Sequence, residues 1–416
     1  MNLQTIGALT SRISNWNPST VVEEIPFLYI DLGSIDQQQK RITRATSLLT
    51  KDAPSRARQL VRAGDILVST VRPNLNSVAV VPPELDGATA STGFCVLRPA
   101  QDLDASYLFH WVRSPAFVSE MTRKATGQSY PAVSDRIIKS SKIPLPPPQE
   151  QRAIAQMLDS VDNLRSKRRS SISLLDDLSR SEFYQMFGDV VRNDRGWDDN
   201  STLEAVAEIA SGITKGRKSP SSPVRTIPYV TVLNVQERRL DLSVVKSIEA
   251  SEAEISRYRL VYNDLLLTEG GDPDKLGRGT LWRNELPECI HQNHIFRVRL
   301  KDDIGVDPVF LSWMVASERG RRYFLRSAKQ TTGIASINTT QLKRFPLLLP
   351  PLPLQQNFAR KIIEIERAAQ TYSAQLTKID ELFMSLQSSA FDGKLALDPS
   401  LAFRRPAGNA QKATAS

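Results

Sequence analysis

The stretch Ile143–Gln151, with the sequence IPLPPPQEQ, returns as LLPPLPLQQ at Leu348–Gln356. Each copy opens a helix-like segment, and one offset of 204 residues relates Pro146–Phe187 to Pro350–Phe391 without insertion or deletion. A period of this length far exceeds the roughly 20–50 residues of solenoid repeats. The repeat therefore predicts two copies of a whole domain, each followed by its own long helix, in a pseudo-twofold molecule.

The residues behind each proline pair have the periodicity of a packed helix. Apolar positions in both copies follow alternating steps of four and three residues, which is the 3.5-residue period of a coiled-coil seam. Proline suits the first turn of a helix, where a missing N–H costs little. The expected seam residues are Ile154, Leu158, Val161, Ile172, Leu175, Phe358, Ile362, Ile365, Tyr372, Leu376, Ile379, Phe383 and Leu386.

Two helices of this length would each extend on the order of 55–60 Å, at about 1.5 Å per residue. That is long enough to hold two domains apart. Two equivalent helices within one chain would pack most simply in an antiparallel pair. The alternative is that each helix folds back on the domain that precedes it.

Each helix is preceded by a segment with mixed strand and helix signals in the same order. Short β-like runs include PFLYI from Pro26 and DILVSTV from Asp65 in the first segment, and PYVTVLNV from Pro228 and NDLLLTEG from Asn263 in the second. One helix is expected after the strands in each, around residues 107–124 and 308–329.

The expected fold class is α+β, with two pseudo-twofold-related mixed α/β domains separated by two long antiparallel coiled-coil-like helices. The expected segments are a first domain (1–145), a first spacer helix (146–189), a second domain (190–349), a second spacer helix (350–395) and a partly disordered tail (396–416).

Composition points to a globular chain with an anionic partner. No apolar run is long enough for a bilayer span, Met1 begins no signal peptide, and two cysteines are too few for a disulfide framework. We therefore expect a reducing cytoplasm. The net charge is +9, and residues 1–145 (16 basic, 12 acidic) and 190–349 (24 basic, 20 acidic) each carry an excess of +4. This distribution favours two nucleic-acid-facing domains, although many basic proteins bind nothing in particular.

Motifs for catalysis or metal binding are weak. The three histidines, His110, His291 and His294, are not duplicated between the copies, and Cys289 with the latter two has the spacing of no zinc motif. The glycine-rich loop Thr268–Gly279 lacks the order of a phosphate-binding or dinucleotide-binding loop. The sequence therefore predicts a non-catalytic chain with no metal site and no cofactor of its own.

The two proline–glutamine motifs with their helices, each preceded by a Thr-Gly pair (Thr126-Gly127 and Thr332-Gly333), resemble the specificity subunit of type I restriction–modification systems. The resemblance covers nearly the whole chain and implies two target-recognition domains, each reading one half of a split, asymmetric DNA site. It also implies that the helices set the spacer and dock two methyltransferase subunits. Restriction/translocase subunits would join the complex, and the methyl donor and ATP would belong to the partners.

Candidate DNA contacts follow from the chemistry of recognition, in which phosphates supply affinity and base edges supply specificity. Arginine and amide side chains suit bidentate contacts to guanine and adenine. The alternative is that these loops are ordinary solvated turns. Candidates in the first domain are Arg72, Asn74, Asn76, Ser91, Thr92, Gln128 and Tyr130. Candidates in the second are Lys215, Arg217 and Lys218 as phosphate clamps, with Lys275, Arg278, Gln292 and Asn293 as groove readers.

The basic run Arg165–Arg169 in the first helix is a further candidate for the DNA spacer, or it is simply solvated. Three other readings of the chain remain open. It could be the specificity subunit of a related system whose partner fuses methylation and cleavage, a stand-alone DNA-modifying enzyme with unrecognised motifs, or a coiled-coil adaptor that does not bind DNA.

Overall fold

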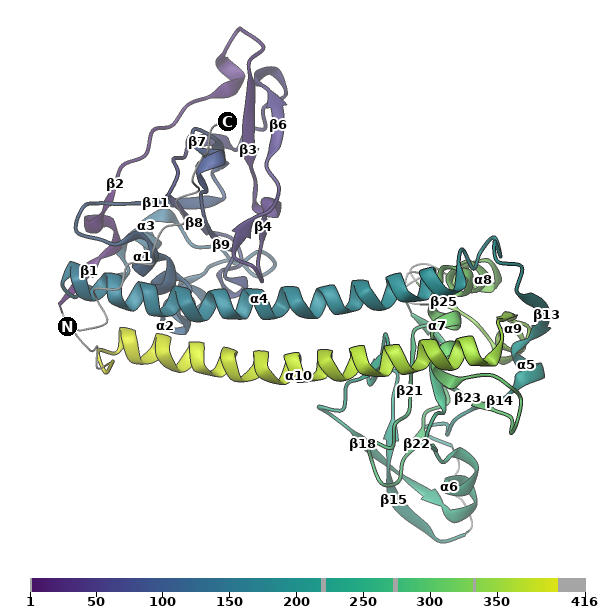
Figure 1. Cartoon of the computed structure of the whole chain (residues 1–416). Helices are drawn as coiled ribbons and strands as arrows, with labels where there is room; N and C mark the ends of the chain where they lie inside the picture. Colours follow the sequence, from purple (N-terminus) through teal and green to yellow (C-terminus); the bar gives the residue numbers. More distant parts are fainter. Residues whose placement is uncertain (1, 218–221, 272–275, 332–333, 396–416) are drawn as a thin grey trace, which may run out of the picture. The chain divides into compact units, whose positions relative to one another are not determined.

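The computed structural model describes residues 2–217, 222–271, 276–331 and 334–395 (Figure 1). The chain divides into two compact units, unit 1 (Met1–Ser171 and Tyr372–Ser416) and unit 2 (Ile172–Thr371). Each unit combines one mixed α/β domain with parts of two 40-residue helices, α4 (Pro148–Phe187) and α10 (Leu352–Phe391). The mixed α/β character predicted from the sequence is confirmed.

Unit 1 contains two four-stranded sheets. The first has the order β6 (Thr46–Leu49), β3 (Pro26–Ile30), β10 (Thr89–Ser91), β7 (Ala57–Leu60), and only its β3–β10 pair is parallel. The second is antiparallel with the order β2 (Thr10–Ser11), β11 (Phe94–Pro99), β8 (Ile66–Ser69), β9 (Val78–Val80). Two small pairs complete it: β4 (Ile35–Asp36) with β5 (Arg41–Ile42), and β1 (Leu3–Thr5) with β12 (Lys142–Pro144).

Unit 2 repeats this topology. Its four-stranded sheet has the order β14 (Ala207–Ser211), β23 (Ile295–Leu300), β19 (Leu265–Thr268), β21 (Gly279–Leu281). Its three-stranded sheet has the order β18 (Lys246–Ser251), β15 (Val224–Val230), β22 (Ile290–His291). The β15–β22 pair is parallel, like β3–β10 in unit 1, and the β15–β18 pair is antiparallel. The small pairs recur as β16 (Val235–Gln236) with β17 (Arg239–Leu240) and β13 (Asp198–Thr202) with β26 (Pro346–Leu349).

One small sheet of unit 2 has no counterpart in the described part of unit 1. It pairs β20 (Gly270–Gly271), β25 (Ile334–Ser336) and β24 (Lys329–Thr331). The second domain has therefore diverged in the loops around a shared scaffold.

The single helix expected after the strands is two helices in each domain. Unit 1 has α1 (Ala105–Val112) and α2 (Pro115–Lys124), and unit 2 has α7 (Pro308–Ala316) and α8 (Glu318–Ser327). In unit 1, Ser114 separates α1 from α2. Its backbone is extended, its hydroxyl accepts Phe117 N–H, and Pro115 at the next position begins the new helix. The shorter helices are α3 (Asp135–Ser140), α5 (Leu203–Val206), α6 (Glu252–Tyr258) and α9 (Thr339–Lys343).

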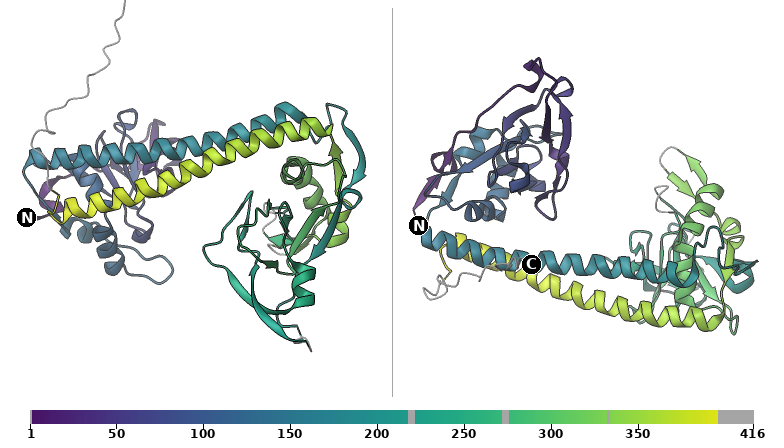
Figure 2. Two further views of the ribbon diagram at one scale, coloured as in Figure 1. Left: turned by 60° about the horizontal axis from the view of Figure 1, so that its bottom comes forward. Right: turned by 45° about the horizontal axis from the view of Figure 1, so that its top comes forward.

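The long helices lie side by side and antiparallel within each unit (Figure 1 and Figure 2). In unit 1, Arg165 Nε on α4 donates to Asp380 Oδ1 on α10 at 2.5 Å. In unit 2, Lys361 Nζ on α10 lies 2.7 Å from Glu182 Oε2 on α4. None of the helices in the described part of the chain has both the length and the apolar composition that crossing a membrane requires.

The repeated glutamine of the two motifs fixes the start of each long helix. Gln151 is fully buried; its Oε1 accepts Asp104 N–H at 2.9 Å, and its Nε2 donates to the carbonyls of Asp102 and Pro146. Gln355 Oε1 likewise accepts Asp307 N–H at 2.9 Å, and its Nε2 donates to the Pro350 carbonyl. Asp104 and Asp307 are the N-caps of α1 and α7, so each glutamine ties its helix to the same point of its own domain.

We expect Gln151→Ala to lower the free energy of unfolding by about 2 kcal/mol, because it removes a fully buried side chain and its hydrogen bonds to the Asp104 N–H and the Asp102 and Pro146 carbonyls. Urea denaturation of the full chain measures this change. Gln156→Ala is the matched control, because Gln156 is an exposed residue one turn further along α4. Equal midpoints for the two variants would contradict the assigned role.

The predicted seam is only partly a helix–helix seam. Near the ends of the helices its residues belong to the domain cores: Ile154, Leu158, Val161 and Phe383 in unit 1, and Phe358 and Ile362 in unit 2. The remaining predicted positions are half-buried: Ile172, Leu175, Ile365, Tyr372, Leu376, Ile379 and Leu386. The alternative of helices that fold back on their own domains is therefore correct for the first turns of each helix.

The far end of each long helix packs on the other copy of the domain. In unit 2, the last residue of α4, Phe187, lies 4.9 Å from the Phe310 ring on α7, centroid to centroid. In unit 1, the last residue of α10, Phe391, lies 5.3 Å from the Tyr107 ring on α1. The two phenylalanines are equivalent in the repeat, and so are the helices they contact. Each domain is thus held by the start of one long helix and the end of the other.

Candidate nucleic-acid interface

The loop after β8 brings together two predicted residues of the first domain. Arg72 has a left-handed backbone (φ 49°), and its N–H donates to the Pro131 carbonyl at 2.7 Å. This contact places the Arg72 guanidinium 4.9 Å from the ring centroid of Tyr130, which is 69% exposed. Gln128 lies in the same loop as Tyr130 and Asn74 follows Arg72, and both are exposed. These four residues are called the Arg72 patch below.

Thr92 is also exposed, in the turn between β10 and β11, but two other predicted contacts are turned inward. Ser91 is only 3% exposed because it ends the central strand β10, and its hydroxyl accepts Gly93 N–H at 3.1 Å. Asn76 Nδ2 donates to the Val112 carbonyl at 3.3 Å, while its Oδ1 accepts from Lys40 Nζ at 3.3 Å. The prediction of DNA contacts is therefore wrong for Ser91 in this conformation, and Asn76 braces the loop.

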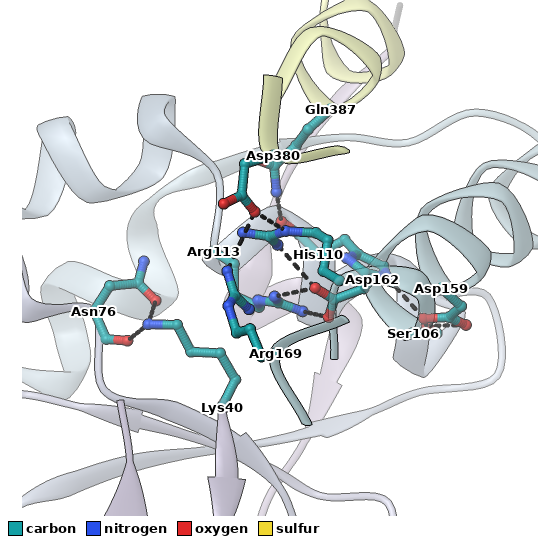
Figure 3. A network of polar contacts seen from close by, with 11 residues as sticks. Lys40, Asn76, Ser106, His110, Arg113, Asp159, Asp162, Arg169, Asp380 and Gln387 are labelled. Atoms are coloured by element: carbon teal, nitrogen blue, oxygen red, sulfur yellow. Dashed lines mark hydrogen bonds and ion pairs between the residues drawn. The ribbon is translucent and has the colours of Figure 1, made fainter. Parts of the chain in front are cut away.

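The three arginines of the basic run contact α10, whereas Lys167 is exposed. Arg165 pairs with both Asp162 (2.8 Å) and Asp380, Arg169 lies 3.2 Å from Asp380, and the Arg168 guanidinium lies 4.2 Å from the Tyr372 ring centroid. The expectation of a solvated face therefore describes Lys167 but not the half-buried arginines. They form a cross-helix network within unit 1 (Figure 3).

The same network ties α1 to the long helices. Asp159 Oδ1 lies 2.7 Å from the buried His110 Nε2, Asp162 accepts from Arg113 at 2.8 Å and 3.1 Å, and Gln387 Nε2 donates to the His110 carbonyl at 2.9 Å (Figure 3). Burial alone would raise the pKa of Asp162, but hydrogen bonds and charge from Arg113 lower it below its usual value.

Lys40 at the tip of the β4–β5 hairpin is also part of this region. Burial, followed by the charges of Arg113 and Arg165, lowers the pKa of Lys40 to about 8. None of these pairings was predicted from the sequence. The sequence shows only that charged residues recur along α4 at Asp159, Asp162 and Arg165, and this spacing does not indicate which residues of other elements they pair with.

In the second domain, the phosphate-clamp prediction fails for Arg217. Its Nε lies 2.5 Å from Glu254 Oε1 and its Nη2 lies 2.8 Å from Oε2, with a further bond to the Glu249 carbonyl. The hydrogen bond from Arg217 lowers the pKa of Glu254 to about 2, so the pair stays ionised. Lys215 is exposed, whereas Lys218 and Lys275 lie outside the described residues.

The predicted groove readers Gln292 and Asn293 form the turn between β22 and β23. Gln292 N–H donates to the Val230 carbonyl and Asn293 N–H to the Ile213 carbonyl, both at 3.0 Å. Gly212 allows this close approach, since a Cβ there would lie 1.9 Å from the His291 carbonyl oxygen. Both amide side chains are half-buried, and Asn293 lies beside an exposed ion pair of His294 and Glu269 (2.6 Å).

The Cys289–His294 stretch is divided between interior and surface. Cys289 is buried, and His291 is fully buried with Nδ1 3.0 Å from the Tyr258 carbonyl. Within the described residues, no three Cys, His, Asp or Glu side chains group as a metal site would require. Burial lowers the pKa of His291 to about 4.

This shift predicts acid sensitivity. Below the usual value of 6.5 the unfolded imidazole gains a proton that folded His291 does not take up until pH falls to about 4. The free energy of unfolding should therefore decrease through this window, by a total of about 3 kcal/mol. Thermal unfolding of the full chain at pH 7 and pH 4.5 should show a smaller difference for His291→Asn, which keeps a donor for the Tyr258 carbonyl. His294→Asn is the control, and an unchanged pH difference in His291→Asn would contradict the prediction.

Comparison with known proteins finds relatives in one family. The profile of the type I restriction modification DNA specificity domain matches residues 48–174, which include the first proline–glutamine motif. The chain is 23% identical over 318 residues to the type I restriction enzyme EcoKI specificity subunit of Escherichia coli (strain K12), covering 73% of this chain and 68% of that protein. It is also 23% identical over 319 residues to the StySPI specificity subunit of Salmonella potsdam, with the same two coverages.

These matches confirm the resemblance of the chain to the specificity subunits of type I restriction–modification systems. Solved structures agree on the fold. The type I specificity subunit from M. genitalium aligns with a TM-score of 0.54 at 13% identity, covering 94% of this chain and 96% of that one. A chain from a study of complex assembly and conformational transition of the type I restriction–modification system aligns with a TM-score of 0.52 at 22% identity, covering 95% and 98%. The chain thus shares its fold with these solved structures over nearly its whole length.

Proposed function

We propose that this specificity subunit reads a bipartite, asymmetric DNA site for a type I restriction–modification complex and performs no chemistry itself. Domain 1–145 reads one half-site and domain 190–349 reads the other. The helices within 146–189 and 350–395 set the spacer. The methyl donor and ATP bind to the partner subunits, and the complex works in the cytoplasm.

The observation that carries the proposal is one topology with two different sets of exposed side chains. The Arg72 patch of domain one offers a guanidinium, two amides and an aromatic ring. The turn between β22 and β23 of domain two offers the exposed His294, paired with Glu269, beside the half-buried Gln292 and Asn293. A pseudo-twofold scaffold with unlike faces suits a non-palindromic site, whereas identical faces would suit a palindrome.

The long helices supply surfaces for the methyltransferase subunits. Exposed apolar side chains occur on both: Leu164, Leu174 and Leu178 on α4, and Leu382 and Met384 on α10. Leu174 is 66% exposed, and Leu178 lies one helical turn further along α4. Exposed apolar side chains on helices outside the domain cores favour protein–protein contacts.

The test is reconstitution with the methyltransferase encoded beside this gene. We expect methylation at one split, asymmetric sequence, mapped over a random DNA library, and none by this chain alone. Methyl transfer by the isolated chain would favour the stand-alone enzyme, and absence of any sequence preference in the complex would favour an adaptor. Restriction genes fused to the methyltransferase gene would identify the related system with a fused partner.

The same mapping with the Arg72→Gln variant tests a single predicted base contact. Loss of a bidentate base contact costs about 1–3 kcal/mol of discrimination at one base pair. We therefore expect relaxed preference at one position of one half-site, with the other half unchanged. Arg62→Gln, an exposed residue of the same domain outside the Arg72 patch, is the control.

A further inference from the structure

Unit 2 has a cavity of about 340 Å³ lined by arginines from three separate segments. Arg239 comes from β17, Arg278 from the loop before β21, and Arg321 from α8. Sequence analysis singled out Arg278 but neither of the other two. The hairpin β16–β17 also contributes Gln236 and Glu237 to the wall.

The cavity is built by close packing and not by chance proximity of surface loops. Gly277 has a left-handed backbone (φ 74°), and a Cβ there would lie 2.6 Å from the Phe324 ring, so α8 rests directly on this loop. Arg278 Nη1 donates to Gln236 Oε1 at 3.2 Å, which joins the loop to the hairpin. Arg278 Nε is enclosed and has no acceptor among the described residues.

The charge balance at the cavity is positive. Arg239 and Arg321 are exposed, and within the described ranges no hydrogen bond or ion pair engages either guanidinium. Among the described residues of the lining, Glu237 is the one carboxylate, and it lies 3.5 Å from Arg180 and 3.7 Å from Arg238. Its charge is therefore shared with two arginines that are not counted among the three of the cavity.

We propose that this cavity binds a phosphoryl group. Guanidinium groups match phosphate oxygens in bidentate geometry, and they are the preferred partners where planar recognition of phosphate is needed. A volume of about 340 Å³ is at the lower end for small-ligand pockets, so it accommodates a phosphoryl group together with an attached sugar. Two sources share this chemistry: a backbone nucleotide of the DNA read by domain two, and a free nucleotide. The first source rests on the proposed function, and the second does not.

The DNA arm uses the full chain in complex with its methyltransferase. Binding to target DNA is measured between 50 and 200 mM salt for wild type, Arg239→Gln, Arg321→Gln and the double variant. Each phosphate contact contributes about 0.9 to the slope of log K against log salt, so the double variant should lose about that much. Arg326→Gln is the matched control, because Arg326 is exposed on the same helix α8 but does not line the cavity.

The free-ligand arm uses AMP as the probe, measured by equilibrium dialysis against the full chain alone. Binding that is lost in the double variant and retained in Arg326→Gln would identify a free nucleotide as the source. A salt slope reduced only in the cavity variants, with no AMP binding, would identify the DNA backbone. Either result supports the pocket, and circular dichroism verifies that each variant is folded.

The proposal is overturned if the cavity variants match Arg326→Gln in both arms. It is also overturned if the folded double variant fails to assemble with the methyltransferase while AMP binding to the chain alone is the same as for wild type, since the cavity would then be a protein-docking surface. If wild type shows no sequence-selective DNA binding but AMP binds through the cavity arginines, the proposed function fails and the phosphoryl pocket stands.

Discussion

Replacing residues 1–145 with the corresponding domain of another specificity subunit is expected to change one half of the methylated sequence and leave the other half unchanged. Each mismatched base pair costs about 1–3 kcal/mol, so preference for the original half-site should fall by about a hundredfold or more. The physical reason is that the Arg72 patch belongs entirely to this domain, while domain two has its own core. Methylation-site mapping of the chimaeric complex measures the change.

The junction with the long helices limits where the exchange can be made. His110 and Arg113 on α1 pair with Asp159 and Asp162 on α4, and Gln387 on α10 donates to the His110 carbonyl. A donor domain without these partners would leave the Asp159 and Asp162 carboxylates unpaired, which destabilises the junction. A chimaera that keeps residues 105–124 of the host should therefore fold better than one that replaces them.

Exchange of residues 190–349 is the reciprocal control, and it should change the other half-site alone. If either exchange alters both halves, the domains do not read independently. A chimaera that is folded and assembled but methylates the original sequence would place recognition outside the exchanged domain.

Inserting seven residues into each long helix is expected to lengthen the spacer between unchanged half-sites by up to about three base pairs. Seven residues add about 10 Å of helix, and a base pair rises about 3.4 Å. The insertions belong after Ser171 in α4 and after Thr371 in α10, where the chain divides into its two units. An insertion of seven residues keeps the 3.5-residue apolar period in phase, so the side chains that contact the other helix stay on the same helix face on both sides of the insertion.

The measurement is the mapped methylation motif of the double insertion in complex with the methyltransferase. The same seven residues in α4 alone are the control, since they put the two helices out of register and should abolish methylation. Altered half-site sequences with an unchanged spacer would show that the helices do not set the distance.

The two domain–helix junctions are chemically unlike although their topology is the same. Trp313 on α7 occupies the place of His110 on α1, and it stacks with Phe183 (5.9 Å between centroids) and lies under Arg238 (4.4 Å). Arg238 in turn lies 2.6 Å from Asp176 on α4. One junction is thus mainly polar and the other mainly aromatic, so a domain from one position is poorly matched to the other. This mismatch provides a physical reason for a fixed order of the two domains.

The sequence by itself determined the duplicated plan. The 3.5-residue period and the proline at each helix start are local patterns, and they predicted both long helices to within a few residues. The runs that became β3 and β8 were also visible, because alternation and β-branched residues are local properties. The equal offset of Gln151 and Gln355 marked the two helix starts before any contact was known.

Only the tertiary structure decided which polar side chains are available. Arg217 was removed from the candidate interface by Glu254, 37 residues away, and Arg165 by Asp380, 215 residues away. Ser91 was removed because β10 is an interior strand of its sheet. The cavity of Arg239, Arg278 and Arg321 also depends on tertiary packing, which brings together three segments that are separate in the sequence. A side chain's charge is local to the sequence, but its partner and its solvent exposure are properties of the packed chain.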